Sequence, residues 1–349
     1  MRKIYINGRF LTQKITGVQR FGIEVTKMLD EIAQKGEIEI LSPPGIINDL
    51  NLTNIRIRQI GRKSNNLWVQ LTLPLYVKIH HGLLLTLSGM LPVLCPDFFV
   101  CHDVTFRRFP GTFSRAFEIM YYLDFKLTLH RCKTIFTISH FSKNEICNVF
   151  KMKNSNFELV SPSSEHLLLK DYNDISVSKW GLSKGEYYLS VSSRARHKNQ
   201  NFISELAKKS PDKKFVIIGG RTQNIKEYKQ EQVDNLVHTG YVTDDELYSI
   251  YKNAKGFIFP SLYEGFGLPP LEAITMGIRH IAVSDIEVFR EIYDRDVYFF
   301  DPFLVNEFDF DIFSRIEISE STYDHYLEKY SWNKTAKVIY NTIKNKWVK

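Results

Sequence analysis

Two acidic residues flank a glycine turn in the stretch 259–273, which reads FPSLYEGFGLPPLEA. Glu264 precedes the turn, and Glu272 follows it after seven intervening residues. A carboxylate accepts hydrogen bonds from two neighbouring hydroxyls at once, which suits it to the vicinal diols of a sugar. The backbone N–H groups of a glycine turn that opens a helix favour phosphate. The stretch therefore predicts a site for two sugars joined by a diphosphate, as in a nucleotide-sugar.

A simpler interpretation assigns these acids no ligand. Glu272, expected in the first turn of the following helix, would favour the helix dipole, and Glu264 would be a solvated loop acid. The surrounding pattern favours the functional interpretation, because an apolar strand leads into the turn and Pro269 and Pro270 suit a helix start.

Strand-like runs alternate with amphipathic segments of helix length along the 349 residues, a pattern typical of βα units in parallel sheets. The length exceeds the usual limit for one core, so we expect two α/β domains of similar size. The expected strand 256–259 would end beside the glycine turn, where ligands of such sheets collect. In the first half we expect strands at 3–6, 37–41, 83–86, 98–101, 134–138 and 157–160.

Composition excludes several classes of protein. The chain is 44% hydrophobic and 24% charged, as in an ordinary globular protein. It has no run of eighteen apolar residues, and the apolar run at its amino terminus is too short for a signal peptide. Its four cysteines lack metal-ligand spacing. We therefore expect a cytoplasmic protein with reduced thiols.

The charge is uneven. Residues 1–165 hold 21 lysines and arginines against 13 acids, a net +8, and residues 166–349 hold 25 against 26, a net −1; together they give the overall +7. This asymmetry indicates either an anionic partner of the first half or a solvated basic surface. We expect no nucleic-acid partner, because no nucleic-acid-binding motif accompanies the charge.

These motifs together resemble those of the retaining, metal-independent glycosyltransferases of family 4. The family has the GT-B architecture, in which two doubly wound Rossmann-like domains face an interdomain cleft. Its signature is two glutamates separated by seven residues, often around Glu-Gly-Phe-Gly-Leu-Pro, and Glu264 to Glu272 matches it closely. The resemblance implies that Glu264 contacts the donor sugar and Glu272 the nucleotide ribose. It also implies that backbone amides of the glycine turn contact the sugar and the diphosphate; these are the amides of Gly265, Phe266, Gly267 and Leu268.

The same resemblance implies further donor contacts. A basic pair after the first strand of the second domain would neutralise the diphosphate; Lys198 matches one member, and either Arg194 or Arg196 matches the other. The turn that contacts the base through its backbone would include Tyr241 and Val242.

In the first domain, Gly17 matches the glycine loop that approaches the donor phosphate, although many members have two glycines there. His102 and Asp103 match a pair that faces the cleft, in which the histidine touches the transferred sugar and the aspartate lies on the acceptor side.

The expected domains are an acceptor-binding domain at 1–165, a nucleotide-sugar-binding domain at 166–330, and a carboxyl-terminal helix at 331–349 that packs back toward the first domain. The acceptor would be a glycan, lipid-linked, in the synthesis of a bacterial surface polysaccharide such as O-antigen or capsule. We expect peripheral contact with the anionic inner face of the cell membrane. The candidate contacts are Arg56, Arg58, Arg62, Lys63, Arg107 and Arg108, the last two beside Phe106 and Phe109.

Three alternatives stay open from the sequence. The chain could be a nucleotide-sugar epimerase on the same architecture or a non-catalytic nucleotide-sugar-binding subunit. A metal-dependent transferase would use an Asp-x-Asp motif, present at 294–296 and 309–311. Neither motif has donor-binding context, so we interpret both as surface acids and expect no metal and no cofactor beyond the donor. The nucleotide, the sugar and the linkage are not specified by the sequence.

Overall fold

The computed structural model describes residues 2–153, 156–168, 171–220 and 232–347. The chain divides into two compact units. Unit 1 comprises 1–104, 119–162 and 331–349, and unit 2 comprises 105–118 and 163–330. The segments 105–118 and 163–165, which the sequence analysis placed in the first domain, therefore fall in unit 2.

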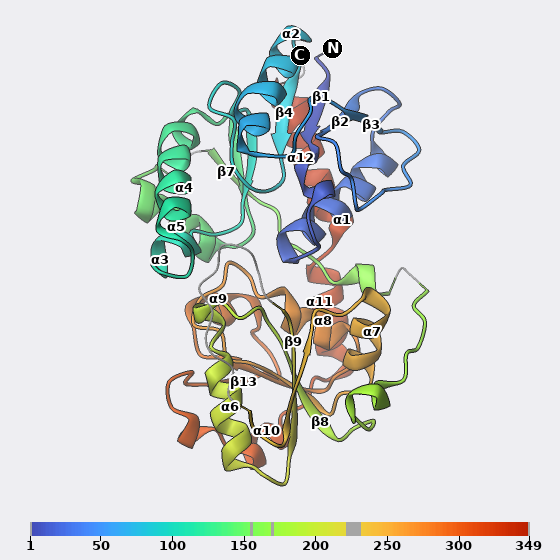
Figure 1. Cartoon of the computed structure of the whole chain (residues 1–349), viewed down its shortest axis with the longest axis vertical. Helices are drawn as coiled ribbons and strands as arrows, with labels where there is room; N and C mark the ends of the chain where they lie inside the picture. The colour runs from blue at the N-terminus through green and yellow to red at the C-terminus, as the bar shows by residue number, and fades with distance from the viewer. Residues whose placement is uncertain (1, 154–155, 169–170, 221–231, 348–349) are drawn as a thin grey trace. The chain divides into compact units, whose positions relative to one another are not determined.

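Unit 1 is built on a seven-stranded parallel sheet with the strand order β3-β2-β1-β4-β5-β6-β7 (Figure 1). The strands are β1 (Ile4–Asn7), β2 (Ile38–Ser42), β3 (Arg56–Gln59), β4 (Leu83–Thr86), β5 (Phe98–Cys101), β6 (Thr134–Thr137) and β7 (Phe157–Leu159). Six of these match the expected strands. The sequence analysis missed β3 because it is an exposed edge strand with charged residues and lacks an apolar run.

Helices and short helical turns connect these strands. They are η1 (Gly8–Thr12), α1 (Gly17–Ile32), η2 (Trp68–Thr72), α2 (Leu73–Ile79), α4 (Arg115–Thr128), η3 (Leu129–Arg131), α5 (His140–Phe150) and α12 (Trp332–Trp347). Local chemistry explains their starts. For example, the Ser139 hydroxyl accepts a hydrogen bond from the backbone N–H of Ser142 and so caps α5.

The carboxyl-terminal helix α12 packs within unit 1 against α1. The ring of the buried Trp332 meets Phe21 edge-on, with 5.6 Å between ring centroids. Farther along α12, the Tyr340 hydroxyl donates to Glu37 Oε2 at 2.7 Å. The last two residues of the expected helix, 348 and 349, lie outside the described residues.

Unit 2 is built on a six-stranded parallel sheet with the order β10-β9-β8-β11-β12-β13 (Figure 1). The strands are β8 (Tyr187–Val191), β9 (Lys214–Ile218), β10 (Leu236–Gly240), β11 (Gly256–Phe259), β12 (His280–Ser284) and β13 (Tyr298–Phe300). The helical elements are α3 (Thr105–Arg108), η5 (Glu165–Leu167), η6 (Val177–Trp180), η7 (Arg196–Lys198), α6 (Gln200–Lys209), α7 (Asp244–Lys252), α8 (Leu268–Thr275), α9 (Glu287–Ile292), η8 (Val305–Glu307), α10 (Phe310–Arg315) and α11 (Glu320–Lys329). The expected fold, two parallel-sheet Rossmann-like domains, is confirmed.

The strand order of unit 2 reverses between β8 and β11. These neighbouring strands are parallel. From β8 the following strands β9 and β10 extend toward one edge of the sheet, and from β11 the strands β12 and β13 extend toward the other. At such a switch point the connections after the two strands separate, and the crevice they leave is the usual ligand site of an open α/β sheet. The segments that follow β8 and β11 contain the basic cluster and the glycine turn singled out in the sequence.

In unit 1, a buried carboxylate joins η2 to α4. Asp124 of α4 is 4% exposed and accepts hydrogen bonds from Gln70 Nε2 at 3.1 Å and from the backbone N–H of Leu91 at 2.9 Å. Burial raises the pKa of the Asp124 carboxyl to about 7 despite these two hydrogen bonds.

We predict that Asp124→Asn flattens the pH dependence of stability between about pH 4 and pH 7. In this window the folded wild type binds more protons than the unfolded chain, so its free energy of unfolding falls as pH rises, by up to roughly 4 kcal/mol from this one group. The amide cannot titrate and removes this contribution. Urea denaturation at several pH values measures it, and parallel curves for the two proteins would contradict the prediction.

Candidate functional site

The glycine turn after β11 has a backbone that no other residue type fits. Gly267 has φ of +92°, and a Cβ built on it would lie 2.5 Å from Cε1 of the buried Phe289. The Tyr293 hydroxyl donates to the Gly267 carbonyl oxygen and fixes the turn. Helix α8 begins directly afterwards at Leu268, so its free N–H groups face the turn.

An ion pair joins the two segments that leave the switch point. Lys198 ends η7 after β8, and Glu264 follows β11; the lysine Nζ lies 2.6 Å from Glu264 Oε1. Their side chains are 20% and 12% exposed, so solvent screens the pair only partly. Residues separated by 66 positions in the sequence thus meet at the site that the motif predicted.

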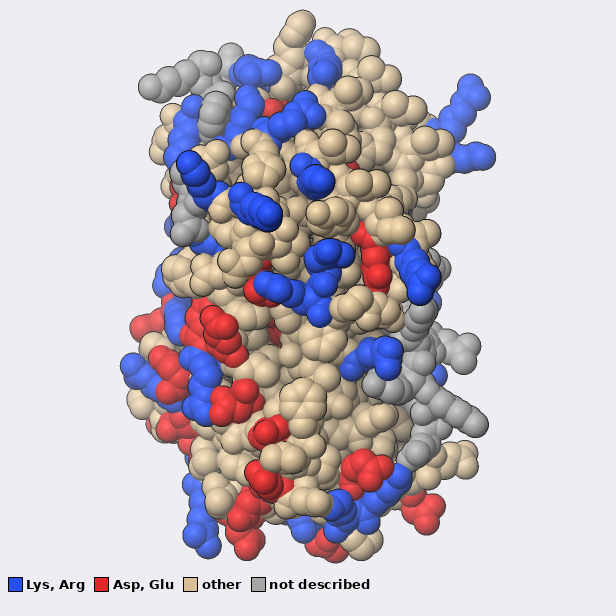
Figure 2. All heavy atoms as spheres, turned by 90° about the vertical axis from the view of Figure 1, so that its left-hand side faces the viewer, with Lys and Arg blue, Asp and Glu red and all other residues tan. Residues whose placement is uncertain are grey.

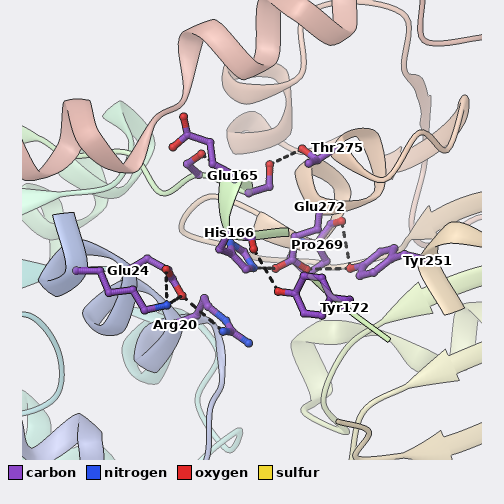
Figure 3. Close-up of polar contacts among 12 residues, drawn as sticks. Arg20, Glu24, Glu165, His166, Tyr172, Tyr251, Pro269, Glu272 and Thr275 are labelled. Carbon is purple, nitrogen blue, oxygen red and sulfur yellow. Dashed lines mark hydrogen bonds and ion pairs between the residues drawn. The ribbon is translucent and has the colours of Figure 1, made fainter. Parts of the chain in front are cut away.

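The second glutamate of the motif lies on α8 in a buried polar cluster (Figure 3). Glu272 Oε2 accepts a hydrogen bond from the Tyr251 hydroxyl at 2.9 Å, and its Oε1 lies 3.6 Å from His166 Nε2. Burial, and then the charge of Glu272, raise the pKa of Tyr251, so this phenol stays a hydrogen-bond donor. Tyr251 therefore holds one carboxylate oxygen, and His166 lies beside the other.

The expectation that Glu272 lies in the first turn of its helix is wrong. The helix starts at Leu268, two residues before Pro270, so Glu272 is its fifth residue. The favourable effect of the helix dipole falls off within the first turn, which removes the simpler explanation for this acid.

The sequence analysis missed Tyr251 and His166. Tyr251 belongs to the apolar face of α7, where its pattern matched a core aromatic, and His166 lies in the polar connection between the units. Neither position has a spacing relation to Glu272 in the sequence, so only the fold reveals the cluster.

Backbone segments at the ends of β8, β9 and β10 approach one another closely. Gly219 has φ of +136°, and a Cβ on it would lie 1.9 Å from the Ser192 carbonyl oxygen. Its N–H donates to the Gly240 carbonyl oxygen at 2.9 Å. Tyr241, which follows Gly240 in the chain, is 61% exposed. Val242, at the start of the segment leading to α7, is buried. This edge of the sheet therefore presents closely packed backbone together with the Tyr241 side chain, and its role as the base-contacting turn stays a prediction.

The two arginines left open by the sequence differ in environment. Arg194 is half-buried, and its charge, together with burial, lowers the pKa of His238 on β10. Arg196 is exposed. His197 lies in the sequence between Arg196 and Lys198. Burial, and then the charge of Lys198, lower the pKa of His197 to about 3, so this histidine is neutral at physiological pH. The positive charge of this segment therefore comes from the arginines and the lysine.

In unit 1, His102 follows β5 in a half-buried position. Its Nε2 lies 2.9 Å from the Leu87 carbonyl oxygen, which can only accept, so Nε2 carries the proton. Burial lowers the pKa of His102, which favours the neutral ring with Nδ1 as an acceptor. The ring of Phe21 meets it edge-on at 4.9 Å. Asp103, next to it, is half-buried.

Gly17 is the first residue of α1, one turn before Phe21. A Cβ on Gly17 would meet no described atom within 4 Å, so the space beside this helix start is open. The Thr16 side chain bonds to Gln19 and does not cap the helix. Also on α1, Arg20 Nη1 lies 3.6 Å from Glu24 Oε1 (Figure 3). Unit 1 thus brings His102 and the start of α1 together through Phe21.

Carboxylates of both Asp-x-Asp motifs have structural partners. Asp296 accepts hydrogen bonds from Ser319 Oγ at 2.8 Å and Thr322 Oγ1 at 2.7 Å. Asp309 caps α10 by accepting from the backbone N–H groups of Asp311 and Ile312. Within the residues that the structure describes, no group of three or more His, Cys, Asp or Glu side chains could hold a metal ion.

The expected surface aromatics beside Arg107 and Arg108 face inward. Phe106 is 6% exposed, and Phe109 contacts the rings of His197 and Tyr263 at 6.1 and 5.8 Å. Of the other basic candidates, Arg58 binds the buried Glu39 at 2.7 Å. No helix among the described parts of the chain is long and apolar enough to cross a membrane.

Comparison with known proteins shows similarity to glycosyltransferases. Residues 174–317 match the family described as "Glycosyl transferases group 1". The chain is 25% identical over 313 residues, 82% of its length, to the O-antigen chain mannosyltransferase RfbU of Salmonella typhimurium, covering 83% of that protein. A shorter stretch of 67 residues, 19% of the chain, is 45% identical to the serotype-specific mannosyltransferase WbdA of Escherichia coli, covering 8% of that protein. These matches support a glycosyltransferase enzyme.

Solved structures of the GT-B fold resemble the whole chain. Sucrose-phosphate synthase from Thermosynechococcus elongatus has a TM-score of 0.70 at 13% identity, with 99% of each chain covered. Alr3699/HepE of Anabaena, solved in complex with UDP and glucose, has a TM-score of 0.69 at 13% identity with the same coverage. At these identities the likeness establishes the fold.

We predict that Gly267→Ala destabilises the protein more than Gly277→Ala does. Both glycines have positive φ, which costs an alanine about 1–2 kcal/mol. Only at Gly267 would the new Cβ also strike the buried Phe289, whereas at Gly277 no described atom lies within 4 Å. Thermal and urea denaturation measure the difference, and equal losses would show that the turn can relax.

Proposed function

We propose that the chain is a retaining, metal-independent mannosyltransferase that moves mannose from a nucleoside-diphosphate donor to a glycan acceptor. The observation that carries this proposal is the meeting of Lys198 with Glu264 at the switch point of unit 2, directly before the glycine turn. The similarity to an O-antigen mannosyltransferase, which extends over 82% of the chain, supports mannose as the sugar.

In the proposed donor complex, the diphosphate lies beside the glycine turn and the positive segment after β8. Backbone N–H groups of Gly265 through Leu268 and the start of α8 would receive its negative charge. Lys198 would bridge between the diphosphate and Glu264, with Arg194 or Arg196 adding a second positive charge. Groups fixed before reaction stabilise the departing diphosphate without reorganisation, often the largest contribution to catalysis.

The glutamates hold the sugars on either side of the diphosphate. Tyr251 binds Glu272 Oε2, and Oε1, which lies 3.6 Å from His166 Nε2, would accept a hydrogen bond from a ribose hydroxyl. Glu264 would accept from hydroxyls of the transferred mannose. In unit 1, neutral His102 would accept a hydrogen bond from the same sugar through Nδ1.

The reaction would proceed on one face of the sugar. The bond from the anomeric carbon to the diphosphate oxygen breaks as the acceptor oxygen approaches from the same side. A new glycosidic bond forms there, and the acceptor proton passes to the departing diphosphate oxygen. The configuration at the anomeric carbon is thereby retained, and no protein carboxylate is required as a nucleophile.

The proposed acceptor is a lipid-linked glycan of a bacterial surface polysaccharide, such as O-antigen, at the inner face of the cell membrane. Two observations support it: the O-antigen relative that matches most of the chain, and the +8 net charge of residues 1–165. Anionic lipid attracts basic surface residues by about 1 kcal/mol each, which favours peripheral contact.

We predict that nucleoside-diphosphate mannose and a glycan acceptor give an α-linked product from an α-linked donor, with full activity in EDTA. Nucleotide release with GDP-, UDP- and dTDP-sugars identifies the donor, and proton NMR of the product assigns the anomeric configuration. An inverted product would reject retention, and activity restored only by Mn²⁺ or Mg²⁺ would reject metal independence. Donor turnover that needs no acceptor would favour an epimerase, and no turnover a binding subunit.

We predict that Glu272→Ala weakens nucleotide binding by roughly 10- to 150-fold, since a charge-assisted contact to ribose contributes about 1.5–3 kcal/mol. Tyr251→Phe keeps the carboxylate but removes its anchor, so its loss of affinity should be smaller. Tyr248→Phe is the matched control, because Tyr248 lies on the same helix and stacks on Tyr172. Calorimetric titration measures all three. Wild-type affinity in a folded Glu272→Ala protein would reject the ribose assignment.

A further inference from the structure

A stripe of exposed aliphatic side chains runs along η2 and α2 in unit 1. The stripe consists of Leu67, Leu71, Leu75 and Ile79, which are between 49% and 71% exposed. Their spacing of four residues places them on one side of the helix, while the other side, including Trp68 and Leu73, is buried in the core. The helix is thus apolar on both sides, and folding buries only one of them.

A second stripe lies on α4. Ile119, Leu123 and Leu127 are 60%, 50% and 57% exposed, again at intervals of four residues. Phe125 and Thr128 on the opposite side are buried. Leaving this much aliphatic surface in water on two neighbouring helices indicates a partner.

Hydrogen bonds hold the two striped helices side by side. Asn66 Nδ2 contacts Met120 Sδ at 3.2 Å, and Gln70 Nε2 donates to Asp124 Oδ1 at 3.1 Å. Each of these four residues immediately precedes or follows a stripe residue. The loop carrying Leu94, which is 42% exposed, is tied to the same seam because the Val93 N–H donates to Gln70 Oε1. The two stripes and Leu94 therefore form one surface, called here the aliphatic surface.

Basic residues surround the aliphatic surface. Lys78 on α2, Lys126 on α4 and Arg131 after it are exposed, as are Arg62 and Lys63 before η2. The segment 67–79 contains no acid, and the one acid in 119–128 is the buried Asp124. In Figure 2, which faces the side where Figure 1 labels α4, lysine and arginine predominate over acids on the surface of unit 1.

We propose that the aliphatic surface docks unit 1 onto an anionic lipid bilayer. Leucine and isoleucine side chains would enter the boundary between headgroups and acyl chains, while the flanking lysines and arginines contact lipid phosphates. A protein partner fits less well. Interface cores are enriched in aromatic residues and Met, whereas the outward side of these helices is aliphatic with a cationic border.

This inference names the membrane contact within the proposed function and rests on that function for the lipid-linked acceptor. It relocates the contact from the arginines at 107 and 108 to η2, α2 and α4. Docking can nevertheless be measured without any sugar substrate, so the two proposals can fail separately.

The test compares the wild type with Leu71→Gln/Leu75→Gln/Leu123→Gln in co-sedimentation with vesicles of phosphatidylethanolamine and phosphatidylglycerol. The wild type should bind at low salt and bind much less to phosphatidylcholine vesicles. The triple variant should bind on the order of 100-fold more weakly, since each leucine that leaves water contributes up to about tenfold. Lys78→Glu/Lys126→Glu should weaken binding mainly at low salt.

The matched control is Ile47→Gln/Ile312→Gln/Val338→Gln, which removes exposed aliphatic side chains elsewhere and should bind like the wild type. Donor turnover with a water-soluble acceptor should be unchanged in both triple variants, which separates docking from catalysis. Failure of the wild type to bind, or equal binding by the leucine variant, would overturn the proposal. A wild-type dimer that the leucine substitutions convert to monomer in light scattering would assign the surface to a second copy of the chain.

Discussion

The reversal of strand order between β8 and β11 is the constraint on which the candidate site depends. Two adjacent parallel strands deliver their following segments to the same edge of the sheet, and those segments then move apart. The ion pair of Lys198 with Glu264 spans this opening. Each partner offsets the other's charge, and the pair holds both side chains where the proposed diphosphate and sugar would lie.

Steric limits around the opening explain why its backbone is glycine-rich. At Gly219 a side chain would collide with the Ser192 carbonyl, and at Gly267 with Phe289. The close approach of Gly219 to Ser192 and of Gly267 to Phe289 restricts the backbone of both loops on the side that faces the core. The side chain of Glu272 is restricted in a similar way, because Tyr251 and His166 contact it from separate elements and limit its motion. The site is rigid where it joins the sheet and polar where it faces outward.

The sequence was sufficient for the features that depend on local pattern. Buried strands such as β11 are continuous apolar runs, and the two glutamates around the glycine turn have a fixed spacing, so both could be predicted. Glu272 was expected in the first turn of α8 but is its fifth residue, because the two prolines indicate a nearby helix start without fixing the residue at which it lies. Strand β3 was missed because an exposed edge strand needs no apolar run.

Features that depend on distant packing could not be predicted. Nothing near Tyr251 in the sequence indicates that its hydroxyl meets Glu272. Phe106 and Phe109, flanked by arginines, suggested an interfacial cluster, yet Phe106 is buried and the ring of Phe109 packs beside that of Tyr263. The leucines of η2 and α2 matched an ordinary amphipathic helix, and only the burial of the opposite side showed that four of them remain in water.

The return of α12 to unit 1 affects how the protein is made. Trp332 completes the apolar contacts of Phe21. The Tyr340 hydroxyl donates a hydrogen bond to Glu37, although more than 300 residues separate these two in the sequence. A ribosome delivers the amino-terminal part first, so the α1 face that α12 covers waits until the whole of unit 2 has been synthesised. During that interval the nascent chain exposes an apolar surface, and unit 2 can complete its own core before unit 1 does. Deleting α12 would therefore damage unit 1, although most of unit 1 is translated before it.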